Sequence, residues 1–94
     1  MTEHFQTARV FLPNNVTTQL AAATTGCTQI RLTAYPSVNG AQVYISNSDA
    51  TAPDPNQSYP IVPGIEYQMP GVEQAVYGWC TGGAIVYVTI YWTA

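Results

Sequence analysis

Few side chains in this sequence could carry out acid–base or nucleophilic chemistry. His4 is the single histidine, and it lies among the first residues of the chain, where the backbone is usually poorly fixed. A catalytic base must be held by a rigid scaffold, so His4 is a weak candidate. The sequence also lacks the G-x-S-x-G, H-E-x-x-H and glycine-rich phosphate-binding motifs. We therefore predict no catalytic residues and no enzymatic activity.

Two pairs of carboxylates remain as candidates for a site. Glu66 and Glu73 could form an acid–base pair, but Glu66 alternates with apolar residues along a predicted strand, which favours a solvated face. Asp49 and Asp54 could supply oxygen ligands to a calcium ion. Their spacing matches no calcium-binding motif, which favours an ordinary polar loop. We predict no metal site and no cofactor.

The two cysteines, Cys27 and Cys80, are far apart in the sequence, and neither has a metal-ligand neighbour at C-x-x-C or C-x-x-H spacing. Cytosolic thiols stay reduced, so two free thiols that act as small apolar side chains are favoured over a disulfide. Late oxidation in an extracellular particle stays open if the two strands are neighbours.

Aromatic residues are the other candidate signal. Seven tyrosines, two tryptophans and two phenylalanines make up 12% of the chain, and such rings can stack on sugars or fill protein interfaces. Many of them occupy strand positions where rings pack across strands, namely Tyr67, Tyr77, Trp79, Tyr87 and Tyr91. The sequence therefore favours a core or subunit interface, with a glycan site as the alternative.

The elements that must position these residues are strands. Apolar residues recur with a period of two, and turn residues follow about every eight to twelve positions. The predicted strands are 5–11, 16–20, 27–35, 41–46, 59–62, 65–69, 74–80 and 83–92, with a single helical turn as an option within 17–25. Asn39-Gly40 can supply a type I′ hairpin turn. This pattern predicts an all-β protein: an antiparallel β-sandwich or small jelly-roll-like barrel of seven to eight short strands.

The size and charge of the chain limit its function. Ninety-four residues with a net charge of −3 support one domain, with residues 1–15 as an N-terminal arm or first strand and residues 16–94 as a single β-sandwich domain. Arg9 and Arg31 are the only basic residues, too few for binding to nucleic acid or to an anionic membrane. We see no signal peptide and no membrane-spanning stretch, so we expect synthesis in the cytoplasm.

The low share of charged residues, 7%, has two interpretations: a surface that a partner covers, or a surface solvated by Thr, Ser, Asn and Gln. The last predicted strand bears on this choice. Val86, Val88, Ile90 and Trp92 lie on one face, and Ile85, Tyr87 and Tyr91 lie on the other. Since both faces are apolar, we predict that the N-terminal segment or a second subunit covers the strand.

Several segments of the chain together form a recognisable pattern. They are Ile30-Arg31-Leu32, Val43-Tyr44-Ile45-Ser46-Asn47-Ser48, Tyr59-Pro60-Ile61-Val62-Pro63-Gly64 and Ala75-Val76-Tyr77-Gly78-Trp79. An arginine-bearing strand, a V-Y-I strand with a polar loop, a P-G turn and a final hairpin are similar to the head decoration (cement) proteins of tailed bacteriophages. The resemblance covers about residues 27–92. Ser46 departs from it, because glycine is common at that position.

The resemblance implies a structural β-sandwich that assembles as a homotrimer and binds the major capsid protein on the outer surface of the virion. In this setting we expect an interface formed by Phe5, Arg9, Val10, Phe11, Leu12, Tyr87 and Tyr91. Residues 2–15 would then reach over the capsid or a neighbouring subunit and add a strand to it, or else form the first strand of the sandwich. The alternatives are a phage tail or fibre component and, in another class, a small carbohydrate-binding module.

Overall fold

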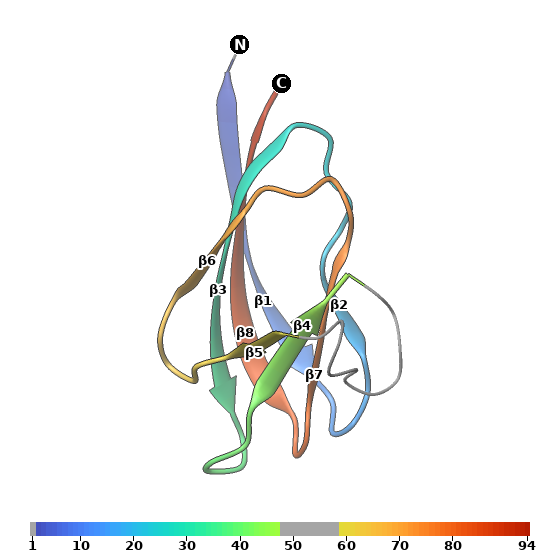
Figure 1. Ribbon diagram of the computed structural model, residues 1–94, viewed down its shortest axis with the longest axis vertical. Coiled ribbons are helices and arrows are strands. Elements are labelled where there is room, and N and C mark those ends of the chain that lie inside the picture. Colours follow the sequence, from blue (N-terminus) through green and yellow to red (C-terminus); the bar gives the residue numbers. More distant parts are fainter. Residues whose placement is uncertain (1, 48–58) are drawn as a thin grey trace.

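The computed structural model describes residues 2–47 and 59–94, which form eight β-strands and no helix (Figure 1). The strands are β1 (Glu3–Leu12), β2 (Thr18–Ala21), β3 (Cys27–Pro36), β4 (Val43–Ser46), β5 (Tyr59–Ile61), β6 (Tyr67–Pro70), β7 (Val76–Cys80) and β8 (Ala84–Thr93). All pairings are antiparallel. The predicted all-β sandwich is confirmed, whereas the optional helical turn within 17–25 is replaced by β2.

The strands form two packed sheets of unequal length. We call the sheet β1-β8-β3-β6 the long sheet, because three of its strands have ten residues each, and the sheet β2-β7-β4-β5 the short sheet, because its strands have three to five. The molecule measures 42 × 23 × 18 Å. The three long strands run along its length (Figure 1), which makes the long sheet the largest regular surface of the fold.

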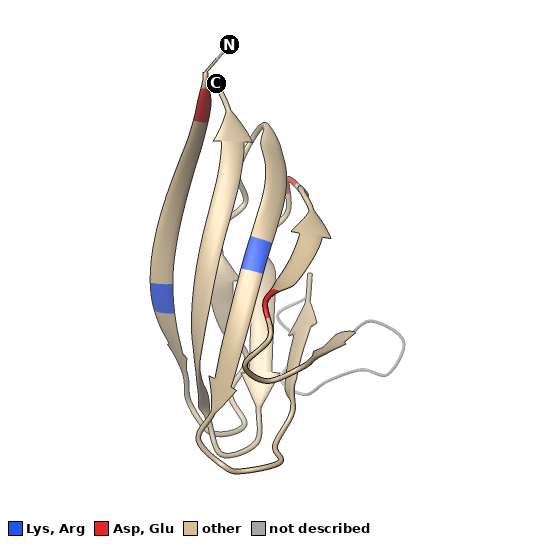
Figure 2. Ribbon diagram, turned by 90° about the vertical axis from the view of Figure 1, so that its left-hand side faces the viewer, with Lys and Arg blue, Asp and Glu red and all other residues tan. Residues whose placement is uncertain are grey.

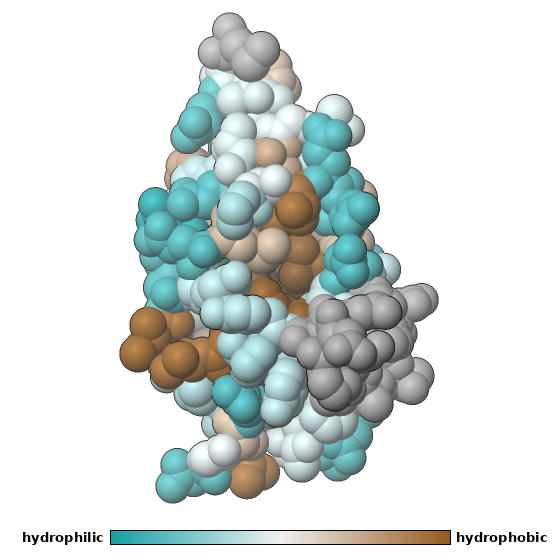
Figure 3. All heavy atoms as spheres, in the orientation of Figure 1, coloured by the Kyte–Doolittle hydropathy of each residue, from teal (hydrophilic) through white to brown (hydrophobic). Residues whose placement is uncertain are grey.

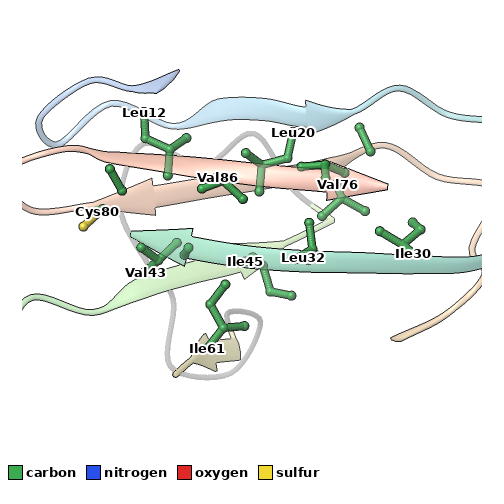
Figure 4. Packing of buried hydrophobic residues seen from close by; sticks show 14 residues of the cluster. Leu12, Leu20, Ile30, Leu32, Val43, Ile45, Ile61, Val76, Cys80 and Val86 are labelled. Atoms are coloured by element: carbon green, nitrogen blue, oxygen red, sulfur yellow. The ribbon is translucent and has the colours of Figure 1, made fainter. Parts of the chain in front are cut away.

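The core lies between the two sheets and is purely apolar. Leu32 and Val86 point into it from the long sheet, and Val43 and Cys80 do so from the short sheet (Figure 4). These four and Val88 are each at most 1% exposed. Alternation explains this arrangement, because successive strand residues point to opposite faces. No polar or charged residue among those described is buried. Hydrophobic burial is therefore the main stabilising contribution.

Most connections between successive strands lead from one sheet to the other, and two of them bear on the predicted turns. Asn39-Gly40 links β3 of the long sheet to β4 of the short sheet, so the predicted type I′ hairpin is wrong. That turn type needs a positive φ at both central residues, and here only Gly40, with φ 84°, has one. The turn after Cys80 likewise leads from β7 in the short sheet to β8 in the long sheet. The final hairpin implied by the resemblance is therefore absent.

The N-terminal segment forms an edge strand of the long sheet. β1 pairs with β8 over ten consecutive residue pairs, from Glu3↔Thr93 to Leu12↔Ala84, without a register shift. Backbone hydrogen bonds between Thr2 and Ala94 extend the ladder. Residues 2–12 thus lie beside β8 rather than over it, and an arm reaching to another molecule would first have to separate from this ladder.

Candidate binding face of the long sheet

The side of the long sheet that faces away from the core is the largest uncovered surface formed by strands. Strand alternation and the registers of β1, β3 and β6 against their neighbours place sixteen side chains on it. We call this surface the outer face. Its residues are Glu3, Phe5, Thr7, Arg9, Phe11, Gln29, Arg31, Thr33, Tyr35, Gln68, Pro70, Ile85, Tyr87, Thr89, Tyr91 and Thr93.

Two tyrosines form the first aromatic group on this face. The rings of Tyr35 and Tyr87 meet edge to face, with centroids 5.8 Å apart and planes at 83°. They line a shallow hollow together with Thr33 and Ile85. Tyr35 is 51% exposed and Tyr87 is 43% exposed. The pair therefore combines a fixed ring geometry with a large contact area that is open to solvent.

A second aromatic group lies further along the same face. Phe5 packs against Tyr91, with ring centroids 6.0 Å apart, and the Arg31 guanidinium carbon lies 5.2 Å from the centroid of the Tyr91 ring, within cation–π range. Gln29 accepts a hydrogen bond from Arg31 Nε at 3.2 Å. Glu66 lies 3.9 Å from a terminal guanidinium nitrogen of Arg31. The guanidinium is thus held in place from several sides.

Both basic residues of the chain have their side chains on this face, and Figure 2 shows their positions on β1 and β3. Arg31 is near the middle of β3, whereas Arg9 is on the edge strand β1 and is exposed. The ion pair to Glu66 engages Arg31, but within the described ranges 2–47 and 59–94 Arg9 has no carboxylate within 4.0 Å. The face therefore presents one cation that no acidic residue of the described part neutralises.

The structure brings five of the seven predicted interface residues together. Their side chains share the outer face, and they are Phe5, Arg9, Phe11, Tyr87 and Tyr91. Val10 points to the opposite side and packs, half-buried, against the core. Leu12 is 0% exposed within the core, so it cannot contact another molecule while the chain is folded.

Sequence reasoning missed part of the face. Tyr35, Thr33 and Ile85 line the hollow at one end of the face but are not among the expected interface residues. A signal for Tyr35 was present in the alternation of β3, where Leu32 and Ala34 point inward and so direct Tyr35 outward. What the pattern could not supply is the neighbour of Tyr35, because the pairing of β3 with β8 is not local.

The covering of β8 also differs from expectation. The short sheet covers its inner face, where Ala84, Val86 and Val88 are buried, but nothing in the described part of the chain lies over Tyr87. The N-terminal segment, one of the two expected covers, flanks β8 in the same sheet. The described part of the chain therefore leaves the outer face of β8 uncovered, with Tyr87 43% exposed.

The candidate chemical groups lie apart from this face or already have partners. His4 stacks on Trp92, with ring centroids 5.5 Å apart. Glu73 accepts a hydrogen bond from the Gly26 backbone N–H at 2.7 Å, and Glu66 accepts one from Gln68 at 3.1 Å. No three His, Cys, Asp or Glu side chains of the described residues are grouped as metal ligands would be. Asp49 and Asp54 lie outside the described residues.

The two cysteines are free thiols at different ends of the sandwich. Cys27 begins β3 opposite Trp92, and Cys80 ends β7 opposite Val43. Cys80 is fully buried, and this burial raises the pKa of its thiol. Both cysteines thus have the unpaired state that the sequence favoured, and Cys80 acts as a small apolar core residue.

Aromatic and apolar groups also occur elsewhere on the surface. Tyr44 and Trp79 pair on the outer side of the short sheet, with ring centroids 6.3 Å apart, and both are half-buried. The connection between β5 and β6, at the lower left of Figure 3, carries exposed Val62 and Ile65. These groups are smaller than the outer face, and the first of them provides a matched control for it.

Comparison with known proteins identifies no relative: no family model matches the chain, and neither a curated protein nor a solved structure does. The geometry alone therefore defines the class of protein, a small antiparallel β-sandwich with an uncovered aromatic sheet face. In the described part of the chain no helix is long and apolar enough to cross a membrane.

Proposed function

We propose that this chain is a non-enzymatic structural protein of a phage virion, a decoration protein that binds the major capsid protein on the outer surface of the head. The observation that carries the proposal is the outer face of the long sheet, which leaves Phe5, Phe11, Tyr35 and Tyr87 exposed at 43–69% of their surface. Phe11, Ile85 and Tyr35 lie side by side across β1, β8 and β3, and monomeric proteins rarely leave a large apolar group uncovered unless it binds a partner.

The composition of the outer face suits a protein partner. Aromatic residues and arginine are enriched in protein interfaces, whereas lysine and acidic residues are depleted. The face follows this pattern, since it combines aromatic rings with Arg9 and Arg31 and contains no lysine and a single acidic residue, Glu3. Thr33, Thr89 and Gln68 add hydrogen-bonding groups without charge. Binding therefore buries apolar area while few ions lose their hydration.

Ring geometry favours protein contact over sugar stacking. A sugar stacks on the flat side of an aromatic ring, so a glycan platform presents rings that are nearly coplanar. Tyr35 and Tyr87 are instead at 83° to each other, and together they form a ridge beside a shallow hollow. A ridge and a hollow match the side chains of a protein surface better than they match a sugar ring.

The fold suits a structural role because the face is rigid. Outer-face side chains are held on three ten-residue strands that are paired along most of their length. Binding to such a face costs little conformational entropy, since the backbone is already ordered. A cement protein needs this property, because it adds cohesion only if it does not deform itself.

Binding to heads tests the proposal directly. The purified chain is mixed with assembled heads that lack it, and the bound fraction is measured by co-sedimentation. We expect saturable binding that Tyr87→Ala weakens by about 30-fold or more, the loss typical of a central aromatic residue in an interface. The matched control is Tyr44→Ala, which removes a tyrosine from the short sheet and should bind as the wild type does.

Other outcomes point to the alternatives. Absence of binding to heads, with binding to purified tails or fibres, would replace the decoration role by a tail or fibre role. If a sugar quenches the tryptophan fluorescence of the chain, and the chain does not bind heads, the carbohydrate-binding module would be established instead. Equal loss of head binding in Tyr87→Ala and Tyr44→Ala would remove the outer face from the proposal.

A further inference from the structure

The four edge strands of the sandwich differ in how they are protected against pairing with another strand. Proteins protect edges by making them short, by bulges and by prolines. β2 has four residues and a register shift, β5 has three residues including Pro60, and β6 has four residues and ends at Pro70. β1 has ten residues with no proline and no register shift. Among the described strands, β1 alone is a long and unprotected edge.

The free edge of β1 offers a regular row of hydrogen-bonding groups. Thr2 and Ala94 exchange both backbone hydrogen bonds, with N···O distances of 3.1 and 3.0 Å. Because bonded and non-bonded pairs alternate in an antiparallel ladder, the even residues of β1 bond to β8. The odd residues direct their N–H and C=O groups away from β8, and they are Glu3, Phe5, Thr7, Arg9 and Phe11.

The same row is complementary to itself in charge. β1 carries one acid, Glu3, and one base, Arg9, and both side chains are on the outer face. Two copies of β1 running antiparallel across a two-fold axis at Gln6 place Glu3 of each copy opposite Arg9 of the other. Opposite charges directly across two strands are stabilising. In this register Phe5 of each copy faces Thr7 of the other, and all four pairs use free-edge residues.

We propose that two copies of this chain pair through β1 and form one continuous eight-stranded sheet. The occupant of the edge is thus a second copy, and the interface is the same segment on both subunits, as a two-fold axis requires. The order of strands across the dimer is β6-β3-β8-β1, followed by β1-β8-β3-β6 of the second copy. The two outer faces then lie side by side on one surface.

This inference is independent of the proposed function, because it concerns an edge and not the partner of the outer face. It differs from the homotrimer that the resemblance implied, because a contact between identical segments about a two-fold axis joins two subunits and not three. A dimer that fails to bind heads would overturn the function alone. A monomer that binds heads would overturn the dimer alone.

The first experiment blocks one backbone donor of the free edge. Thr7→Pro removes an N–H that points away from β8, so the pairing of β1 with β8 keeps all its hydrogen bonds. The control Thr7→Ala keeps the N–H. Like Thr7→Pro, it loses the hydrogen bond between the Thr7 and Thr89 hydroxyl groups, which lie 3.1 Å apart. The mass of each protein is measured by light scattering during size exclusion. We expect a mass of twice 10.2 kDa for the wild type and Thr7→Ala, and the mass of a monomer for Thr7→Pro.

A second experiment tests the register by exchanging charges. Arg9→Glu alone and Glu3→Arg alone place like charges opposite each other in the proposed register, so each should weaken the dimer by about tenfold. The double variant Glu3→Arg with Arg9→Glu restores two opposite pairs and should regain the dimer. A mixture of the two single variants should form mixed dimers, because one supplies two cations and the other two anions.

Three results would overturn the inference. The first is a wild-type mass of one or three chains over the accessible concentration range. The second is a Thr7→Pro variant that stays dimeric. The third is a double variant, Glu3→Arg with Arg9→Glu, that is no more dimeric than either single variant. Circular dichroism of each variant reports whether the sandwich has formed. If Thr7→Pro fails to fold, the charge variants decide, because their substitutions lie at exposed positions.

Discussion

Tyr35 and Tyr87 face each other across two neighbouring strands of the long sheet and meet edge to face at 5.8 Å. In the registers, Tyr87 is directly opposite Thr33, so Tyr35 reaches it diagonally. The pair joins β3 to β8 on the side that the core does not stabilise. It is both part of the candidate binding face and a local contribution to the stability of the sheet.

Coupling between these two rings can be measured. In a first double-mutant cycle, Tyr35→Phe, Tyr87→Ala and the double variant are compared by urea unfolding. Tyr87→Ala should account for most of the loss in free energy of unfolding, because Tyr35→Phe retains the ring. Replacing both by Ala in a second cycle should give a coupling free energy of about 0.5–1.5 kcal/mol, as for other aromatic pairs. A coupling of zero would mean that the two rings do not contact each other in solution.

Removal of a core side chain should cost far more than removal of an outer-face side chain. Leu32 is fully buried between the sheets, so Leu32→Ala should lower the free energy of unfolding by about 2–5 kcal/mol. The neighbouring Thr33 points to the outer face, and Thr33→Ala should cost less than about 1 kcal/mol. Equal losses in urea unfolding would contradict the assignment of the two faces of β3.

Gly83 should tolerate no side chain, for two separable reasons. Its φ is +83°, and an added Cβ would lie 2.7 Å from the Leu12 carbonyl oxygen. Gly40 has nearly the same φ, +84°, but open space around it. Gly40→Ala should therefore cost about 1–2 kcal/mol, from the left-handed backbone alone, and Gly83→Ala should cost clearly more. Thermal unfolding of both variants gives the comparison.

Stability should decline in alkaline solution partly through Cys80. Burial raises the pKa of this thiol in the folded chain. Above about pH 8.5 the thiol of the unfolded chain loses its proton while that of the folded chain keeps it, so the unfolded state is favoured as the pH rises. We expect Cys80→Ala to lose less stability than the wild type between pH 7 and about pH 9.5 in urea unfolding. Identical slopes would contradict an inaccessible Cys80 thiol.

The location and type of the strands could be predicted from the sequence, whereas their partners could not. The alternation of Ile30, Leu32 and Ala34 with polar residues is local and indicates a strand with one buried face. Asn39-Gly40 correctly marks a turn, but the same residues suit a hairpin and a crossing between sheets. The choice between these depends on contacts with distant strands, such as that of β4 with β7.

The candidate site shows the same division. The sequence predicts Phe5, Tyr87 and Tyr91 in an interface, because the last strand is apolar on both faces and the N-terminal segment carries apolar residues outside the main set of strands. Leu12 has the same apolar character and yet is buried, because the register with Ala84 directs it inward. One residue of displacement along a strand separates a contact residue from a core residue, and only pairing fixes that displacement.

The position of β8 determines when this chain can fold. Among the strands of residues 2–47 and 59–94, β8 alone pairs with both β1 and β3, yet it comes last in the chain. On the ribosome, β1 therefore has no intramolecular partner until residues 84–93 have emerged. Its unprotected edge and exposed phenylalanines stay open throughout synthesis, which is the period of greatest risk for aggregation. The long sheet is then completed in one late step, in which β8 inserts between β1 and β3.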